Sequence, residues 1–124
     1  MVIVDTSVWI DSFRSSDPQL RDWMNEDLLL QHPFVTAEVA MGSFGSNEAR
    51  DRTIDFLGGF AQLPVAQPDD FHCFVGEHSL YGTGLGFADA HLLLACRNHP
   101  LARLATRDKR LANAAERLAI EIVG

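Results

Sequence analysis

The chain has 124 residues, of which 47% are hydrophobic and 22% are charged, and its formal net charge is −7. This length and composition fit one globular domain with a hydrophobic core, and we expect residues 1–124 to form it. No apolar stretch reaches the roughly 20 residues that a membrane-spanning helix needs, and no secretory leader is recognisable, so we expect a cytoplasmic protein.

Short apolar runs alternate along the chain with segments of helical periodicity. The runs predict strands at residues 2–4, 28–31, 63–65, 101–105 and 120–123. Caps, prolines and apolar spacing predict helices at residues 6–13, 18–28, 33–41, 46–57, 68–81, 87–97 and 108–118. This alternation favours an α/β fold with a mainly parallel sheet.

Two acids stand directly after predicted strands. Asp5 follows the run at residues 2–4, and Asp108 follows the run at residues 101–105. The carboxyl ends of parallel strands are where open α/β sheets build their sites. Each acid could instead serve only as the N-cap of the helix that follows it.

Two further acids lie within apolar helical segments. Asp89 is the only acid in residues 85–96, and Glu38 lies within the apolar run at residues 34–41. The helix dipole offsets only about 0.3–1 kcal/mol of the several kcal/mol needed to desolvate a carboxylate. Asp89 could escape this cost at a partly exposed helix end, and Glu38 could do so at a rim.

The joint placement of these four acids predicts one cluster around a cation. Carboxylate oxygens suit Mg²⁺ or Mn²⁺, which can activate water and neutralise a phosphodiester. The five histidines show no zinc-ligand spacing. His91 is two residues from Asp89 and so faces another way on a helix, which indicates a packing or surface role.

The negative net charge conceals one basic segment. Residues 97–117 hold six basic side chains against two acids, a local charge of +4, and the remaining chain carries −11. Arg107, Lys109 and Arg110 are therefore candidate phosphate contacts, although the segment is equally consistent with a solvated helix face. The glycines at positions 82, 84 and 86 form a turn, without the sequence context of a phosphate-binding loop.

Four motifs in this order resemble the PIN-domain family. They run Val2-Ile3-Val4-Asp5-Thr6-Ser7, then Glu38-Val39-Ala40-Met41-Gly42, then Gly86-Phe87-Ala88-Asp89-Ala90-His91, then Thr106-Arg107-Asp108-Lys109-Arg110. The motifs span almost the whole chain, and their details are similar to VapC-type toxins of bacterial toxin–antitoxin pairs. One departure is Ala105, where relatives often carry a larger aromatic residue.

The resemblance implies a three-layer α/β/α fold with a parallel, roughly five-stranded sheet. It implies an endoribonuclease that uses Mg²⁺, with Mn²⁺ as the alternative, at Asp5, Glu38, Asp89 and Asp108. Thr6 or Ser7 would support the first acid, and Thr106 the last. It further implies a homodimer that cleaves RNA and is inhibited by a cognate VapB-type antitoxin.

Two other functions stay open from the sequence. A structure-specific DNA nuclease could use the same acids, but the chain shows no additional clamp domain. A non-catalytic PIN-like module could use them to bind a basic partner peptide, although such binding does not require all four acids.

Overall fold

A computed structural model, which describes residues 1–124, contains one parallel sheet of four short strands. The strands, in their order across the sheet, are β3 (Ala61–Gln62), β2 (Leu29–Gln31), β1 (Val2–Val4) and β4 (Arg103–Ala105). In the register of the sheet, Ile3 is opposite Leu30 on one side and Leu104 on the other. All of β1 is buried, as expected for a central strand covered on both faces.

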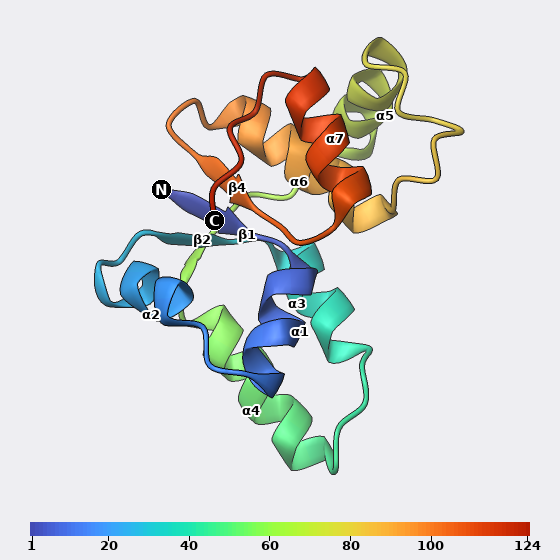
Figure 1. Ribbon diagram of the computed structural model, residues 1–124. Coiled ribbons are helices and arrows are strands. Elements are labelled where there is room, and N and C mark those ends of the chain that lie inside the picture. The colour runs from blue at the N-terminus through green and yellow to red at the C-terminus, as the bar shows by residue number, and fades with distance from the viewer.

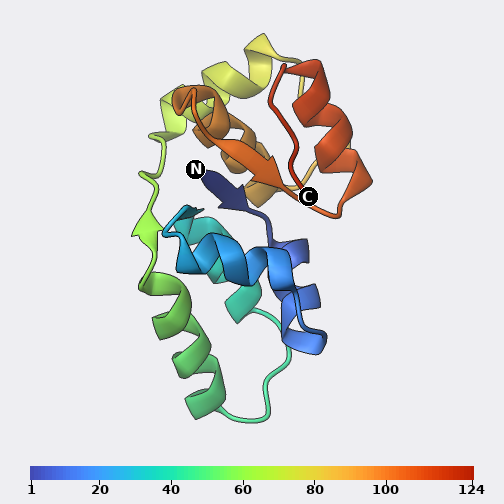
Figure 2. The same ribbon diagram turned by 60° about the vertical axis from the view of Figure 1, so that its left-hand side comes forward.

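Seven helices cover the two faces of the sheet. One layer consists of α1 (Thr6–Arg14), α2 (Pro18–Asn25), α3 (Pro33–Ala40) and α4 (Asn47–Gly58). The opposite layer consists of α5 (Pro68–Glu77), α6 (Phe87–Asn98) and α7 (Lys109–Arg117). Figures 1 and 2 show the two layers below and above the sheet, which confirms the predicted three-layer α/β/α fold. None of the helices combines the length and apolar character that crossing a membrane requires.

The helix starts follow from local capping chemistry. Asp17 accepts a hydrogen bond from the backbone N of Leu20 at 3.0 Å, and Pro18 occupies the first position of α2. Ser46 caps α4 in the same way, accepting from the N of Ala49 at 3.1 Å. Because these caps satisfy otherwise unpaired N–H groups, the sequence predicts the beginnings of these helices correctly.

The third strand lies earlier than predicted, at Ala61–Gln62 instead of residues 63–65. The N–H of Leu63 still donates to the carbonyl of Gln31 at 2.9 Å. Pro64 has no N–H to donate, so the ladder ends there.

The expected fifth strand is reduced to one bridge. Within residues 120–123, Ile122 alone bridges to Leu104, and hydrogen bonds of 2.9 Å run from Leu104 N to Glu121 O and from Val123 N to Leu104 O. The sheet therefore has four strands and a single-residue extension. Helix α5 also ends early, at Glu77 instead of residue 81, because the chain turns through a positive φ at Ser79.

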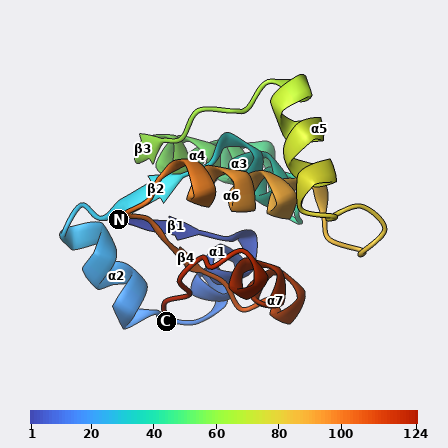
Figure 3. The same ribbon diagram turned by 90° about the horizontal axis from the view of Figure 1, so that it is seen from above.

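One edge of the sheet gathers the chain segments that follow the strands. Figure 3 shows that β1 leads into α1, β2 into α3 and β4 into α7 on the same side. Helix α6 begins on that side and runs back across the sheet. We call this side, where β1, β2 and β4 end and α6 starts, the carboxyl edge.

Candidate metal centre

Asp5 and Asp108 both lie at the carboxyl edge because they follow neighbouring strands. β1 and β4 pair in parallel, with Val4 opposite Ala105, and the N–H of Asp5 donates to the carbonyl of Ala105 at 3.0 Å. Each acid is also the N-cap of the next helix, α1 or α7. The capping role that the sequence allowed is therefore present, and it leaves carboxylate oxygens available for other partners.

Asp5 is the most enclosed of the acids, with 3% of its surface exposed. Its Oδ1 accepts from the backbone N of Thr6 at 2.7 Å. Its Oδ2 accepts from the hydroxyls of Ser7 and Thr106, each at 2.7 Å. These hydroxyls are themselves held, since Ser7 Oγ accepts from Arg107 N and Thr106 Oγ1 accepts from Asp108 N, both at 3.0 Å.

These donors hold the Asp5 carboxylate in one orientation without any cation. Ser7 and Thr106 both donate their hydroxyls to Asp5, although Thr106 was expected to support Asp108, and Thr6 contributes only its backbone N. The Thr6 hydroxyl is buried and has no hydrogen-bond partner.

Asp89 is half-buried in the first turn of α6, and its pKa rises from 3.8 to about 7. Burial is the largest cause, followed by the negative charges of Asp5, Glu38 and Asp108 and a side-chain hydrogen bond with Asp5. The four predicted acids therefore act on one another electrostatically although they come from four separate segments. Nothing comparable to the donors around Asp5 compensates the Asp89 carboxylate.

Glu38 and Asp108 are exposed, so Glu38 has the rim position that the sequence left open. Helix α3 buries Val35 and Val39, which are four residues apart, and Glu38 lies off that stripe. Asp108 lies in the loop that enters α7, where its Oδ1 accepts from the N–H of Arg110 at 2.8 Å. Both side chains therefore lie on the solvent side of the carboxyl edge.

The donor set suits a hard divalent cation, because it consists of carboxylate and hydroxyl oxygens. No three acidic, histidine or cysteine side chains converge closely enough to enclose one ion. Mg²⁺ does not require such a cage, since it usually retains several waters and binds one or two carboxylates directly. Of the four acids, Asp5 is buried and Asp89 is half-buried, whereas Glu38 and Asp108 are exposed.

Two of the three basic candidates are engaged within the protein. Arg107 pairs with Asp11 at 3.1 Å and with Asp17 at 2.8 Å, which ties the loop after β4 to α1 and the start of α2. Arg110 donates to the carbonyl of Gly84 at 2.8 Å. Lys109 is exposed and has neither an ion pair nor a side-chain hydrogen bond, so it is the candidate most available to a phosphate. The sequence did not indicate these intramolecular partners, because all of them are distant along the chain.

Gly84 illustrates how closely α7 approaches the loop that leads into α6. Its φ is +80°, and a Cβ at this position would lie 2.9 Å from Arg110 Nη1. We expect Gly84→Ala to lower the free energy of unfolding by about 1–2 kcal/mol, from backbone strain and displacement of Arg110, in chemical denaturation.

Gly76→Ala in α5 is the matched control for this substitution, since a Cβ there meets nothing within 4 Å. We expect it to be neutral or stabilising by about 0.4–1 kcal/mol. Equal destabilisation by the two substitutions would show that the contact with Arg110 and the positive φ are unimportant.

An aromatic cluster beside the carboxyl edge was not foreseen. The His91 ring stacks on Phe71 at a centroid distance of 4.0 Å, and the rings of Phe34 and Phe87 contact it at 4.7 Å. The packing role expected for His91 is thus confirmed. The spacing of Phe87 and His91, four residues apart on one helix, was the available signal.

Comparison with known proteins gives a consistent family assignment. Residues 2–117 match the family described as PIN domain. Over 111 residues the chain is 42% identical to Ribonuclease VapC32 of Mycobacterium tuberculosis, in the strains CDC 1551 / Oshkosh and ATCC 25618 / H37Rv. That alignment covers 90% of this chain and 87% of the relative.

Solved structures with low sequence identity share the fold. PAE2754 from Pyrobaculum aerophilum has a TM-score of 0.63 at 18% identity, covering 91% of this chain and 83% of that one. FitAcB from Neisseria gonorrhoeae has a TM-score of 0.59 at 18% identity, covering 100% and 97%. FitAB bound to an IR36 DNA fragment has a TM-score of 0.61 at 19% identity, covering 99% and 94%.

Proposed function

Because this chain belongs to the PIN-domain family, and within it to the VapC-type proteins, we propose that it is a divalent-metal-dependent endoribonuclease toxin. The 42% identity to a protein named a ribonuclease supports RNA as the substrate. We further propose that it acts in the cytoplasm and that a VapB-type antitoxin neutralises it.

One observation carries this function most directly. Burial and three neighbouring carboxylates raise the pKa of Asp89 to about 7. Acidic side chains that raise one another's pKa are typical of a site that binds a cation or of a site in which a carboxyl group transfers a proton during catalysis. The charge of Asp5, which already has three hydrogen-bond donors, adds to this rise in the pKa of Asp89.

The chain's own residues would divide the work as follows. Asp89 and Asp5 would hold Mg²⁺ or Mn²⁺, and Ser7 and Thr106 keep the Asp5 carboxylate oriented. Glu38 and Asp108 would help to hold the ion or would orient the attacking water. When bound, the ion supplies activation of water and neutralisation of charge on the phosphodiester.

Phosphate contacts are assigned in the same proposal. Lys109 meets the backbone of the RNA directly, since its exposed ammonium forms no ion pair within the protein. Arg107 and Arg110 mainly shape the loops beside the acids, through Asp17 and Gly84 respectively.

Cleavage assays with purified protein test the proposal. We expect cleavage of RNA with Mg²⁺ or Mn²⁺, no cleavage with chelator, and at least about a hundredfold loss in Asp89→Asn. Single-stranded and duplex DNA serve as comparison substrates, since one structural neighbour is bound to DNA. Preferential cleavage of DNA, or cleavage of RNA that resists both chelator and Asp89→Asn, would contradict the proposed function.

We also propose that the protein is a homodimer. The rings of Phe13 and Phe56 are 49% and 47% exposed and both pack against Trp9, at centroid distances of 6.3 and 5.9 Å. They form an apolar patch on α1 and α4, and such patches often mark interfaces. Light scattering should give twice the mass of one chain and a monomer for Phe13→Arg, whereas a wild-type monomer would refute the dimer.

A further inference from the structure

A groove runs between α7 and the loop that joins α5 to α6 (Figures 1 and 3). It has a volume of about 180 Å³. Arg110, Asn113 and Arg117 line it from α7, where their spacing of three and four residues places them on one stripe of the helix. The remaining lining is Leu80, Thr83, Leu85 and Ala114. We call it the α7 groove.

One end of the α7 groove lies beside the acids. Arg110 is two residues beyond Asp108, and its backbone N–H donates to Asp108 Oδ1 at 2.8 Å. Its guanidinium donates across the groove to the carbonyl of Gly84 at 2.8 Å. Gly86, two residues further along that loop, lies against Asp89, since a Cβ on Gly86 would be 3.4 Å from Asp89 Oδ2. Both walls of this end therefore lead to the carboxyl edge.

The other end of the groove lies near the end of α7. Arg117 is seven residues from Arg110, which corresponds to about 10 Å along the helix axis at a rise of about 1.5 Å per residue. Arg117 is exposed, and its Nη2 donates to the carbonyl of His78 at 3.4 Å. A strand with one phosphate at the acids would therefore pass both arginines if it followed α7.

The α7 groove is positively charged, although the chain as a whole carries −7. Its lining contains two arginines and no acid. Neither Arg110 nor Arg117 forms an ion pair, whereas Arg107 is paired with two aspartates. A guanidinium has five N–H donors, so each arginine retains donors after its bond to a carbonyl. These planar donors match the oxygens of a phosphate.

The neighbours of the two arginines suit a nucleic acid strand better than an isolated anion. Asn113 lies between them on the stripe and is exposed, and its amide can bond to a ribose hydroxyl or a base edge. Tyr81 adjoins Leu80 on the loop, and 69% of its surface is exposed. Basic grooves with exposed aromatic side chains are typical of proteins that bind single strands, because bases stack on the rings.

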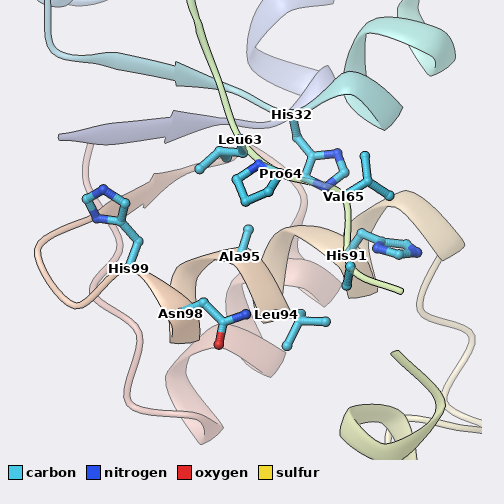
Figure 4. Close-up of a pocket in the computed structure, with 10 residues that line it drawn as sticks. His32, Leu63, Pro64, Val65, His91, Leu94, Ala95, Asn98 and His99 are labelled. Atoms are coloured by element: carbon cyan, nitrogen blue, oxygen red, sulfur yellow. The ribbon is translucent and has the colours of Figure 1, made fainter. Parts of the chain in front are cut away.

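A second cavity, beside α6, offers none of these groups. It has a volume of about 160 Å³ and lies between α6 and the segment that follows β3 (Figure 4). Its lining includes Leu94 and Ala95 from α6 and Pro64 and Val65 from that segment, and it contains no Lys, Arg, Asp or Glu. A phosphate would lose water there without gaining a charged partner, which favours the α7 groove as the path of a strand.

We propose that the α7 groove binds the single-stranded segment of RNA next to the scissile bond, and that Arg117 and Asn113 contact this segment. The inference rests on the proposed ribonuclease function, which places the scissile phosphate at the carboxyl edge. Arg110 joins the near end of the groove to Gly84 and adds its charge. The strand then continues along α7 to Arg117, where its backbone gains a second guanidinium.

Steady-state cleavage of two RNA lengths tests this inference. With an oligonucleotide of about ten residues, Arg117→Gln should raise KM about five- to tenfold and leave kcat within about twofold, because it removes binding without touching the acids. With a trinucleotide, which is too short to reach from the acids to Arg117, the variant should match the wild type. For the longer RNA, the slope of log KM against log salt concentration should fall by about 0.7.

Fluorescence anisotropy of the longer RNA with chelator present separates this inference from the proposed function, since binding is then measured without cleavage. Arg117→Gln should weaken binding about five- to tenfold, even if the protein proves to cut no RNA. Asn113→Asp, which places a negative charge between the arginines, should weaken binding similarly and provides a second test if Arg117→Gln folds poorly. Arg117→Lys retains the charge and should bind within about threefold of the wild type.

Arg52→Gln is the matched control, because it removes an exposed arginine of α4 that lies outside the groove and forms no ion pair. It should bind RNA as the wild type does. The proposal is overturned if Arg117→Gln and Arg52→Gln have equal effects, or if Arg117→Gln impairs cleavage of both RNA lengths equally. Displacement of the labelled RNA by an oligoglutamate peptide at lower concentrations than by unlabelled RNA would assign the groove to an acidic protein segment and also overturn it.

Discussion

Replacing Asp89 with asparagine is expected to stabilise the metal-free protein at pH 8 by about 1–2 kcal/mol, although we expect it to lower cleavage at least about a hundredfold. The pKa of Asp89 is raised from 3.8 to about 7, first by burial and then by the charges of Asp5, Glu38 and Asp108. This rise in pKa corresponds to about 4 kcal/mol, which we reduce because the side chain is only half-buried. Asparagine resembles the protonated acid in shape. It carries no negative charge, so burial and the neighbouring carboxylates do not disfavour it.

The pH dependence of this effect has a definite sign. Between pH 4 and 7 the folded protein binds more protons at Asp89 than the unfolded chain does, so stability falls as pH rises. The advantage of Asp89→Asn should therefore be absent near pH 4, grow through this window and be complete above pH 7. Urea denaturation at several pH values measures it.

Asp70→Asn is the matched control, because Asp70 occupies the same third position in the first turn of α5 and is exposed. It should lower stability by about 0.3–1 kcal/mol through loss of its favourable interaction with the helix dipole. Saturating Mg²⁺ should stabilise the wild type, because an ion that binds only the folded protein shifts the unfolding equilibrium. It should not stabilise Asp89→Asn, whose site lacks one carboxylate. A destabilised Asp89→Asn protein at pH 8 would show that its carboxylate is already compensated.

Thr106→Val should have the opposite effect on stability, lowering the free energy of unfolding by about 1–3 kcal/mol. The Thr106 hydroxyl donates to Asp5 Oδ2 at 2.7 Å and accepts from Asp108 N at 3.0 Å. Valine has the same shape but leaves both partners without this hydroxyl, and unpaired groups of this kind carry such a penalty. Denaturation monitored by Trp fluorescence measures the change.

Cleavage should also fall, by about 10- to 100-fold, because the Asp5 carboxylate is no longer held from this side. Thr106→Ser retains the hydroxyl and should recover most of the stability and the activity. If Thr106→Val and Thr106→Ser behave alike, the hydroxyl does not position Asp5.

The features that could be predicted from sequence are those set by local chemistry. Caps such as Asp17 and Ser46 fixed helix starts, and the positions of Asp5 and Asp108 after parallel strands placed both at one edge. Whether Glu38 is buried or lies at the rim could not be decided from the sequence, because an apolar segment does not show which face of α3 turns inward.

Features that depend on contacts distant in sequence could not be predicted. The partners of Arg107 and Arg110 lie 90 and 26 residues away, so their roles in holding loops were not visible as spacing. The sheet pairing that ends at Pro64 likewise decided where the third strand stops. The aromatic surroundings of His91 combine α3, α5 and α6, which only the fold brings together.

Calorimetric titration of Mn²⁺ into the wild type, Asp89→Asn and Glu38→Gln at pH 7.5 tests most directly whether these acids form one metal site. Asp51→Asn, an exposed acid on α4, is the control. We predict that the wild type and the control bind Mn²⁺ alike and that Asp89→Asn and Glu38→Gln each weaken binding by at least about tenfold. Equal Mn²⁺ affinity in all four proteins, or no binding by the wild type, would contradict a shared metal site at the carboxyl edge.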